Sequence, residues 1–498
     1  MDDRRKLWIL VLCCVGQFMV ILDVSVVNVA LPSIRSDLGF SGTSLQWVVN
    51  AYTLTFAGFL LLGGRACDLL IRRYVYDAGL ALFALASLVG GFAQNETTLI
   101  LARGIQGLGG AVVAPATLSI ITSTFTEGSE RNRALGAWGA MGAAGGAVGV
   151  LLGGVLTEAL SWRWILFINV PIGAFTAIAA TRFVPAERPE SPARRHFDLA
   201  GAVTGTAGLI ALVYAIVKTE AYGWGSARTL TTMAIAAALL AVFVTIEARL
   251  AAAPLMPLRV FRSRELSIAN VIVLLLGSSA FSMWYFLSLY LQEVLGFSPI
   301  ETGLAFLPAT AALAASAQLA GKLIARTGPR RFLIAGMGLI CAGLLLLGRA
   351  AVDGSYAADV LAPFVLAGAG IGMTFVSVTI AGMAGARAAE VGLASGLINT
   401  SRQIGGSLGL AILATLATDR TSSLAGHTSL HVALTSGFHR AFVLGGIFAG
   451  IAGSYAATEA CSEPASEQPV SEARTGGEPG ATRRDGDRAT VTAGVTSS

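Results

Sequence analysis

The chain has 498 residues, of which 54% are hydrophobic and 13% charged, and its mean hydropathy is +0.71. About a quarter of the residues in a soluble domain are charged, so this composition excludes an ordinary soluble fold and indicates a protein largely surrounded by lipid. The formal net charge is +5. The basic residues lie in short loops between apolar stretches and not in one patch, which argues against a nucleic-acid partner.

Apolar stretches long enough to cross a bilayer recur along the chain. A helix needs roughly 20 apolar residues to cross a hydrocarbon core of about 30 Å. We therefore expect an all-α integral membrane protein with about fourteen transmembrane helices, over residues 7–31, 45–64, 75–94, 98–124, 134–157, 163–184, 198–217, 229–248, 266–290, 300–321, 332–350, 358–380, 390–416 and 438–458.

The loops between these spans indicate the orientation. Alternate loops carry clusters of basic residues, among them the arginines of 65–73 and the basic residues of 322–331, whereas the opposite loops carry scattered single charges. Basic residues concentrate on the cytoplasmic side of membrane proteins. The pattern predicts a multi-pass protein of the cell membrane with both termini in the cytoplasm.

Two of the basic loops resemble each other, residues 64–73 after the second span and 321–331 after the tenth. Such a repeat predicts two parallel six-helix bundles with two helices inserted between them. The predicted division is an N-terminal bundle over 1–185, two inserted spans over 186–250 and a C-terminal bundle over 251–458. Residues 459–498 are rich in Glu, Pro, Gly, Ser and Thr, so we expect a disordered cytoplasmic tail.

Charged residues within spans are costly and mark functional positions. Counted at 1.5 Å per residue, Asp23 lies roughly 24 Å into the first span and Arg103 about 8 Å from the outer end of the fourth, so the two share a depth. If these spans face each other, the side chains can pair. A carboxylate whose partner comes and goes can bind and release a proton; a static ion pair that orients the helices is the alternative.

Arg402 lies near the middle of the thirteenth span, with Asn399 and Gln403 on the same helix face. This polar stripe can contact a substrate or bridge neighbouring helices. Beyond the second span, Asp68 with Arg72 and Arg73 forms a charge cluster that can hold one state closed at a helix N-terminus. The alternative is that the cluster only sets topology.

Small and aromatic residues complete the candidate sites. Gly145, Gly149 and Gly153, with Gly154 beside them, form a stripe that allows close helix packing. Several large side chains are candidates to line a substrate cavity, namely Met19, Trp138, Met141, Trp284 and Tyr285. No phosphate-binding loop, nucleophile–base pair or zinc motif is present in the sequence, so we expect neither an enzyme nor a metal protein.

Five stretches together resemble the motifs of the fourteen-span drug:proton antiporter branch of the major facilitator superfamily, residues 22–32, 64–73, 101–110, 139–154 and 162–173. The resemblance implies that Arg103 takes part in proton coupling, and the shared depth makes Asp23 its expected partner in that role. It also implies that Gly64, Asp68, Arg72 and Arg73 form a cytoplasmic gate. Two positions depart from the family pattern, since Ile71 replaces a glycine of the loop motif and Val150 replaces a proline of the antiporter motif.

The resemblance implies a monomer in a lipid bilayer that exports a small toxic compound, such as an antibiotic, by alternating access. Protons entering the cell would drive export, with no cofactor. Two alternatives stay open at this point. The chain can be an uptake symporter for a small organic solute, or a membrane sensor that keeps the fold without transporting.

Overall fold

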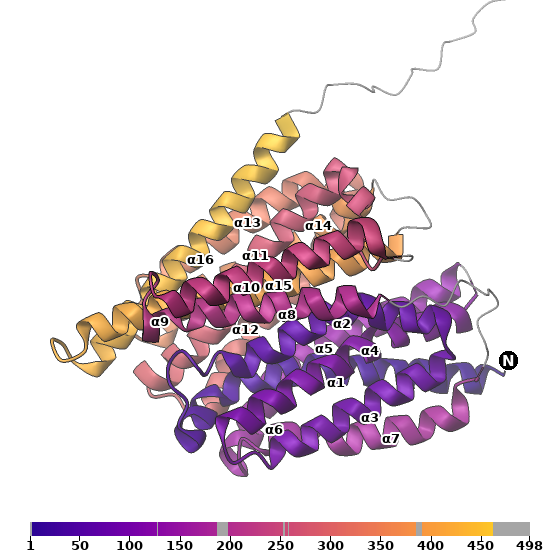
Figure 1. Cartoon of the computed structure of the whole chain (residues 1–498), viewed down its shortest axis with the longest axis horizontal. Coiled ribbons are helices and arrows are strands. Elements are labelled where there is room, and N and C mark those ends of the chain that lie inside the picture. The colour runs from indigo at the N-terminus through magenta and orange to yellow at the C-terminus, as the bar shows by residue number, and fades with distance from the viewer. Residues whose placement is uncertain are drawn as a thin grey trace, which may run out of the picture. The chain divides into compact units, whose positions relative to one another are not determined.

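The computed structural model describes residues 2–126, 128–186, 198–251, 254–256, 258–384 and 391–461, and these residues form helices joined by short loops (Figure 1). Most of the expected tail, residues 462–498, lies outside the described residues. The helices are α1 (Asp3–Leu38), α2 (Trp47–Leu69), α3 (Arg72–Gly91), α4 (Glu96–Thr124), α5 (Ser129–Ala159), α6 (Trp164–Phe167), α7 (Asn169–Phe183), α8 (Leu199–Val217), α9 (Thr219–Tyr222), α10 (Ala227–Thr245), η1 (Ile246–Leu250), η2 (Leu258–Arg262), α11 (Arg264–Leu289), η3 (Tyr290–Val294), α12 (Pro299–Thr327), α13 (Pro329–Leu347), η4 (Tyr356–Val360), α14 (Leu361–Ala384), α15 (Val391–Leu424) and α16 (Leu430–Cys461).

Among the described residues, 13 helices are long and apolar enough to cross a membrane. The short helix α6 and α7 together make one of them, Trp164–Phe183. The remaining predicted span corresponds to α15, which has 34 residues but is less apolar because it carries Asn399, Arg402 and Gln403. The structure therefore has the multi-pass helical architecture that the apolar stretches predict.

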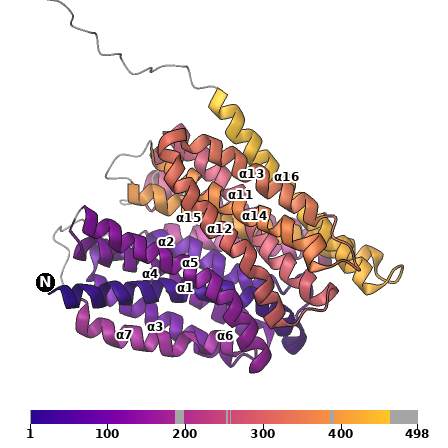
Figure 2. The same ribbon diagram turned by 180° about the vertical axis from the view of Figure 1, so that it is seen from behind.

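The helices pack into two groups, which we call the N-half (α1–α7) and the C-half (α11–α16). In the N-half, α1 packs on α5, α2 on α4, and α3 on both α4 and α7. In the C-half, α11 packs on α15, and α14 packs on α12 and α13. The halves meet where α5 packs on α12 and α2 on α15, as the view from behind shows for α5 and α12 (Figure 2).

The inserted helices α8 and α10 pack on each other, and α8 also contacts α2 and α15. Few residues of α10 are buried, and Leu230, Ile235 and Val242 on it are about half exposed, at 55%, 56% and 47%. Apolar side chains in such positions require lipid around them. In sequence these two helices lie between the halves; the division of the chain into two six-helix bundles and an insertion stays a prediction.

The turn between α2 and α3 consists of Leu70 and Ile71, where the family pattern has glycine in place of Ile71. Ile71 adopts φ −64° and ψ 112°, a conformation open to any residue. The turn therefore forms without a glycine at this position.

The glycine stripe of α5 brings two backbones together. A Cβ on Gly149 would lie 2.7 Å from Ser25 Cβ, and one on Gly153 would lie 2.8 Å from the Val26 carbonyl oxygen, while Gly145 approaches Phe18 in the same way. All three face α1. Gly154 faces the other half instead, because its Cβ would lie 2.5 Å from the Pro299 carbonyl oxygen of α12.

Val150 also lies at the contact between α5 and α12. Its carbonyl oxygen would be 2.6 Å from a Cβ on Gly303. Valine supplies at this position the backbone N–H that proline lacks, within a helix that runs from Ser129 to Ala159. The departure from the family pattern therefore lies at the interface between the halves.

Replacing Gly149 with alanine should destabilise the protein. The new Cβ would lie 2.7 Å from Ser25 Cβ and 2.9 Å from the Leu22 carbonyl oxygen, and overpacking of this kind costs about 1–3 kcal/mol of unfolding free energy. Gly136→Ala on the same helix is the matched control, because a Cβ there meets no atom within 4 Å and alanine favours a helix. Thermal melting in detergent compares them; equal melting temperatures would contradict the close packing of α1 and α5.

Candidate functional site

A cavity of about 1830 Å³ lies between the two halves. The N-half contributes residues of α1, α2, α4 and α5 to its wall, and the C-half contributes residues of α11, α12, α14 and α15. Five of the side chains that the sequence suggests as substrate contacts line it, namely Trp138, Trp284, Asn399, Arg402 and Gln403. The cavity is large enough for a drug-sized molecule, since such sites typically hold about 300–1,000 Å³.

The cavity extends to one end of the helix bundle. Gly64 and Asp68 at the C-terminal end of α2 line it, as do Glu247 of η1 and Arg259 of η2. Asp68 is exposed. The cavity is therefore open at the end where the sequence predicts the cytoplasm.

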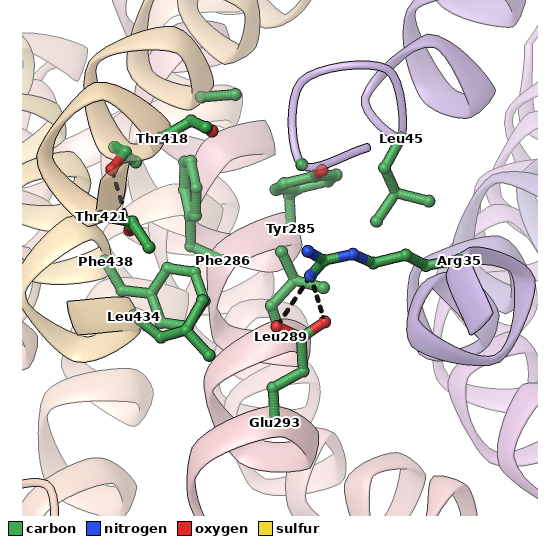
Figure 3. Close-up of a pocket in the computed structure, with 13 residues that line it drawn as sticks. Arg35, Leu45, Tyr285, Phe286, Leu289, Glu293, Thr418, Thr421, Leu434 and Phe438 are labelled. Atoms are coloured by element: carbon green, nitrogen blue, oxygen red, sulfur yellow. Dashed lines mark hydrogen bonds and ion pairs between the residues drawn. The ribbon is translucent and has the colours of Figure 1, made fainter. Parts of the chain in front are cut away.

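The opposite end is closed by polar contacts between the halves. Nη1 of Arg35 on α1 donates to both carboxylate oxygens of Glu293 in η3, at 2.8 and 3.1 Å, and Figure 3 shows the two side chains pointing toward each other. Nearby, the Ser288 hydroxyl donates to the Asn28 carbonyl oxygen at 2.6 Å. The backbone N–H of Ile300 donates to Glu158 at 3.0 Å.

Asp23 and Arg103 lie in contact, both almost completely buried at 0% and 2% exposure. Arg103 Nη1 donates to Asp23 Oδ2 at 2.5 Å and to Gln106 Oε1 at 2.7 Å. The other carboxylate oxygen of Asp23 accepts from Gln106 at 2.6 Å and from Asn169 at 2.9 Å. The carboxylate is thus held by α4 and α7, and its charge is matched by that of Arg103.

The ion pair lies beside the cavity and not in its wall. Ile21 and Val24 of α1 line the cavity, whereas Asp23 between them faces the interior of the N-half. Tyr52 of α2 links the two regions, because its ring lines the cavity and lies 4.5 Å from the Arg103 guanidinium carbon. A movement of Tyr52 would therefore change the surroundings of the ion pair.

The polar stripe of α15 faces the cavity. Arg402 Nη2 donates to Asn399 Oδ1 at 2.8 Å, and the Arg402 guanidinium carbon lies 5.2 Å from the centre of the Phe375 ring. One turn of the same helix also bridges to a neighbour, since the Ser401 hydroxyl donates to Asn270 of α11 at 2.6 Å. The stripe thus contacts the cavity through Arg402 and its neighbouring helix through Ser401.

The charged residues of the predicted cytoplasmic gate do not pair with one another in this conformation. Asp68 lines the open end, and within the described residues it forms no ion pair with Arg72 or Arg73. Arg73 instead donates to the Thr181 carbonyl oxygen at 3.3 Å, which links α3 to α7. A gate between these groups requires a conformation in which the cavity is closed at this end.

Three side chains suggested as substrate contacts are absent from the cavity wall, and the structure corrects these predictions. Met19 is 0% exposed and packs in the core of the N-half. Met141 lies on α5 but outside the set that lines the cavity. Tyr285 lines a separate pocket of about 60 Å³ at the closed end, beside Arg35 and Glu293 (Figure 3).

Sequence reasoning missed several partners of the site. Gln106 follows Arg103 by three residues, a spacing that places both on one helix face. The sequence therefore contains the signal that Gln106 is a neighbour of the ion pair. Asn169 lies within the 162–173 motif, and its amide in an apolar span was a comparable signal. Arg35 and Glu293 are 258 residues apart, and no local pattern joins them.

Replacing Asn169 with leucine should lower the stability of the protein, because it removes a donor to a buried carboxylate, worth about 1.5–3 kcal/mol. Thr176→Val on the same helix is the control. Thr176 is also 0% exposed, but its hydroxyl donates only within the helix, to the Ile172 carbonyl oxygen at 2.6 Å. Thermal denaturation should show the larger loss for Asn169→Leu; matching losses would mean that the carboxylate does not depend on Asn169.

Comparison with known proteins identifies the fold and the family. A sequence profile described as Major Facilitator Superfamily matches residues 13–410. The cephamycin export protein CmcT of Amycolatopsis lactamdurans is 42% identical, over 85% of this chain and 87% of the relative. The puromycin resistance protein pur8 of Streptomyces alboniger is 40% identical, over 87% of this chain and 86% of the relative. A bacterial homologue of the human lysosomal transporter Spinster, solved in an inward-facing and unoccupied conformation, aligns with a TM-score of 0.66 at 16% identity and covers 92% of this chain and 97% of that chain. This chain belongs to the major facilitator superfamily.

Proposed function

We propose that this protein is a proton-driven exporter of small, antibiotic-like compounds that works by alternating access. The observation that carries the proposal is the cavity of about 1830 Å³ between the halves, open at one end and closed at the other. A transporter that rocks two helical groups about a central site passes through such a state. The names of two relatives, a cephamycin export protein and a puromycin resistance protein, support export and the class of cargo.

The proposed location is the cell membrane, with both termini in the cytoplasm. In that orientation the cavity opens to the cytoplasm, where an exporter must collect its cargo. The chain acts as a monomer, since each copy contains both halves and the whole cavity. The driving force is the proton gradient, without a cofactor and without a catalysed reaction.

The proposed coupling site is the Asp23–Arg103 pair. In this inward-open conformation Arg103 and Asp23 form an ion pair, with Nη1 and Oδ2 2.5 Å apart. In the outward-open conformation the pair separates and Asp23 takes up a proton from outside. Return to the inward-open state restores the pair and releases the proton to the cytoplasm.

Asp23→Asn should abolish proton-driven transport while leaving the protein folded. Asparagine has the size of aspartate and its oxygen can still accept hydrogen bonds from Gln106 and Asn169, which keep the site assembled at reduced stability, but it cannot pair with the charge of Arg103 or exchange a proton. The measurement is gradient-driven uptake of labelled cephamycin into everted vesicles, with thermal melting as the check on folding.

Asp37→Asn is the matched control for this variant. Asp37 also lies on α1, but it is 44% exposed and paired with Arg163 at 2.7 Å, and about 21 Å of helix separate it from Asp23. This control should transport at the wild-type rate. Uptake at the wild-type rate by the Asp23→Asn variant would contradict the assignment of Asp23 to proton coupling. If the wild-type protein moved cargo only out of the everted vesicles, it would be an importer.

Glu293→Gln should increase the population of the outward-open conformation, in which the closed end is open. It breaks the ion pair to Arg35, whose side chain is 35% exposed while that of Glu293 is 17% exposed. A pair exposed to this degree contributes up to about 1 kcal/mol, equivalent to roughly a fivefold change in the ratio of outward-open to inward-open protein.

The readout is the labelling of Asn28→Cys by a membrane-impermeant maleimide added outside whole cells, in a background without reactive cysteines. Asn28 lines the cavity directly below the closed end. Labelling should be about fivefold faster with Glu293→Gln and unchanged with Asp37→Asn, whose ion pair lies within the N-half. The same labelling rate in both variants would show that the Arg35–Glu293 pair does not hold this end closed.

A further inference from the structure

The charge of Arg402 is not balanced by the protein in this conformation. Its guanidinium donates to the neutral side chain of Asn399, its Nε is buried without a hydrogen-bond partner, and within the part of the chain that the structure describes no carboxylate pairs with it. Arg402 is half-buried, and a charge that is partly withdrawn from water is expensive to leave unpaired. The cavity that Arg402 faces therefore carries one positive charge here that no protein group neutralises.

The other charged side chains of the cavity wall lie at its open end. They are Arg65, Asp68, Glu247 and Arg259. Both signs are present there, so the open end has no strong preference of its own. Asp23 lies outside the cavity wall and is paired with Arg103. Deep in the cavity, Arg402 thus sets the sign of the field.

The groups around Arg402 fit a planar anion. Arginine presents its N–H groups as a fork that matches the two oxygens of a carboxylate. Gln403, only 6% exposed, lines the cavity next to it and adds an amide donor. The rest of the central wall is apolar and aromatic, with Phe281, Trp284 and Phe375 within reach of the body of a cargo.

We propose that the cavity selects an amphiphilic cargo that carries a carboxylate, which Arg402 binds while the apolar body contacts the aromatic wall. This proposal rests on the proposed export function only in calling the ligand a cargo. Binding at this site does not depend on a proton gradient or on the direction of transport. Cations of the same shape are disfavoured, since the arginine repels them.

The test compares three probes of one shape and different charge, pyrenebutyrate, its methyl ester and pyrenebutylammonium. Binding to the purified full chain in detergent is followed by quenching of tryptophan fluorescence, because Trp138 and Trp284 line the cavity. We expect the wild-type protein to bind pyrenebutyrate most tightly and pyrenebutylammonium least. An equal or tighter affinity for the cation would overturn the proposal without any variant.

Arg402→Gln should lower the affinity for pyrenebutyrate by about ten- to a hundredfold, the range for charge-assisted hydrogen bonds, and leave the affinity for the ester nearly unchanged. Arg402→Lys, which keeps the charge and loses the fork, should fall between. Arg65→Gln removes the same charge at the open end and should weaken pyrenebutyrate by about twofold at most. Equal weakening of acid and ester by Arg402→Gln, or an effect of Arg65→Gln as large as that of Arg402→Gln, would overturn the proposal.

The outcomes separate this proposal from the proposed function. If the protein binds pyrenebutyrate through Arg402 but does not move cephamycin under a gradient, export fails and the binding site stands. If the protein exports cephamycin and binds all three probes alike, export stands and the role of Arg402 fails.

Discussion

The ion pair between Asp23 and Arg103 organises the N-half. Neither charge can reach water, so each must be neutralised by protein groups. Arg103 uses its guanidinium on Asp23, on Gln106 and on the Val48 carbonyl oxygen at 3.0 Å, and Asp23 accepts from α4 and α7. Because these bonds join α1, α2, α4 and α7, rotating one helix alone would leave a buried charge unpaired. The N-half is therefore expected to move as one unit as long as the pair is intact, and the proposed separation of the pair is what allows its helices to shift.

Movement must then occur between the halves, and their contacts are suited to breaking. Arg35 and Glu293 are partly exposed, so water replaces each partner when the pair separates. The close approach of Gly154 to Pro299 involves backbones that pack tightly but share no buried charge. Strong bonds within a half and weaker ones between halves allow rigid-body motion.

Depth along a span could be predicted from the sequence, but the face on which a residue lies could not. A helix is a fixed ruler of 1.5 Å per residue, and counting along it was enough to place Asp23 and Arg103 at one level, where the structure has them in contact. Met19 and Tyr285 show the limit. In lipid, the outer and inner faces of a helix are both apolar. The periodicity of hydrophobic residues therefore does not predict which large side chains face the cavity. Contacts such as Arg35–Glu293 depend on how the halves dock, which no single span encodes.

The two arginines within the spans, Arg103 and Arg402, differ in where their charge is balanced. Arg103 is neutralised inside the protein, and Tyr52 lies between it and the cavity, so an anionic cargo does not compete with Asp23. Arg402 is left for the cargo. This division also has an energetic consequence for the proposed exchange. When a monoanion leaves as one proton enters, two positive charges in effect move inward, each worth about 2.3 kcal/mol per 100 mV of membrane potential. A membrane that is negative inside therefore drives the export of an anion twice over, once by expelling the cargo and once by drawing in the proton.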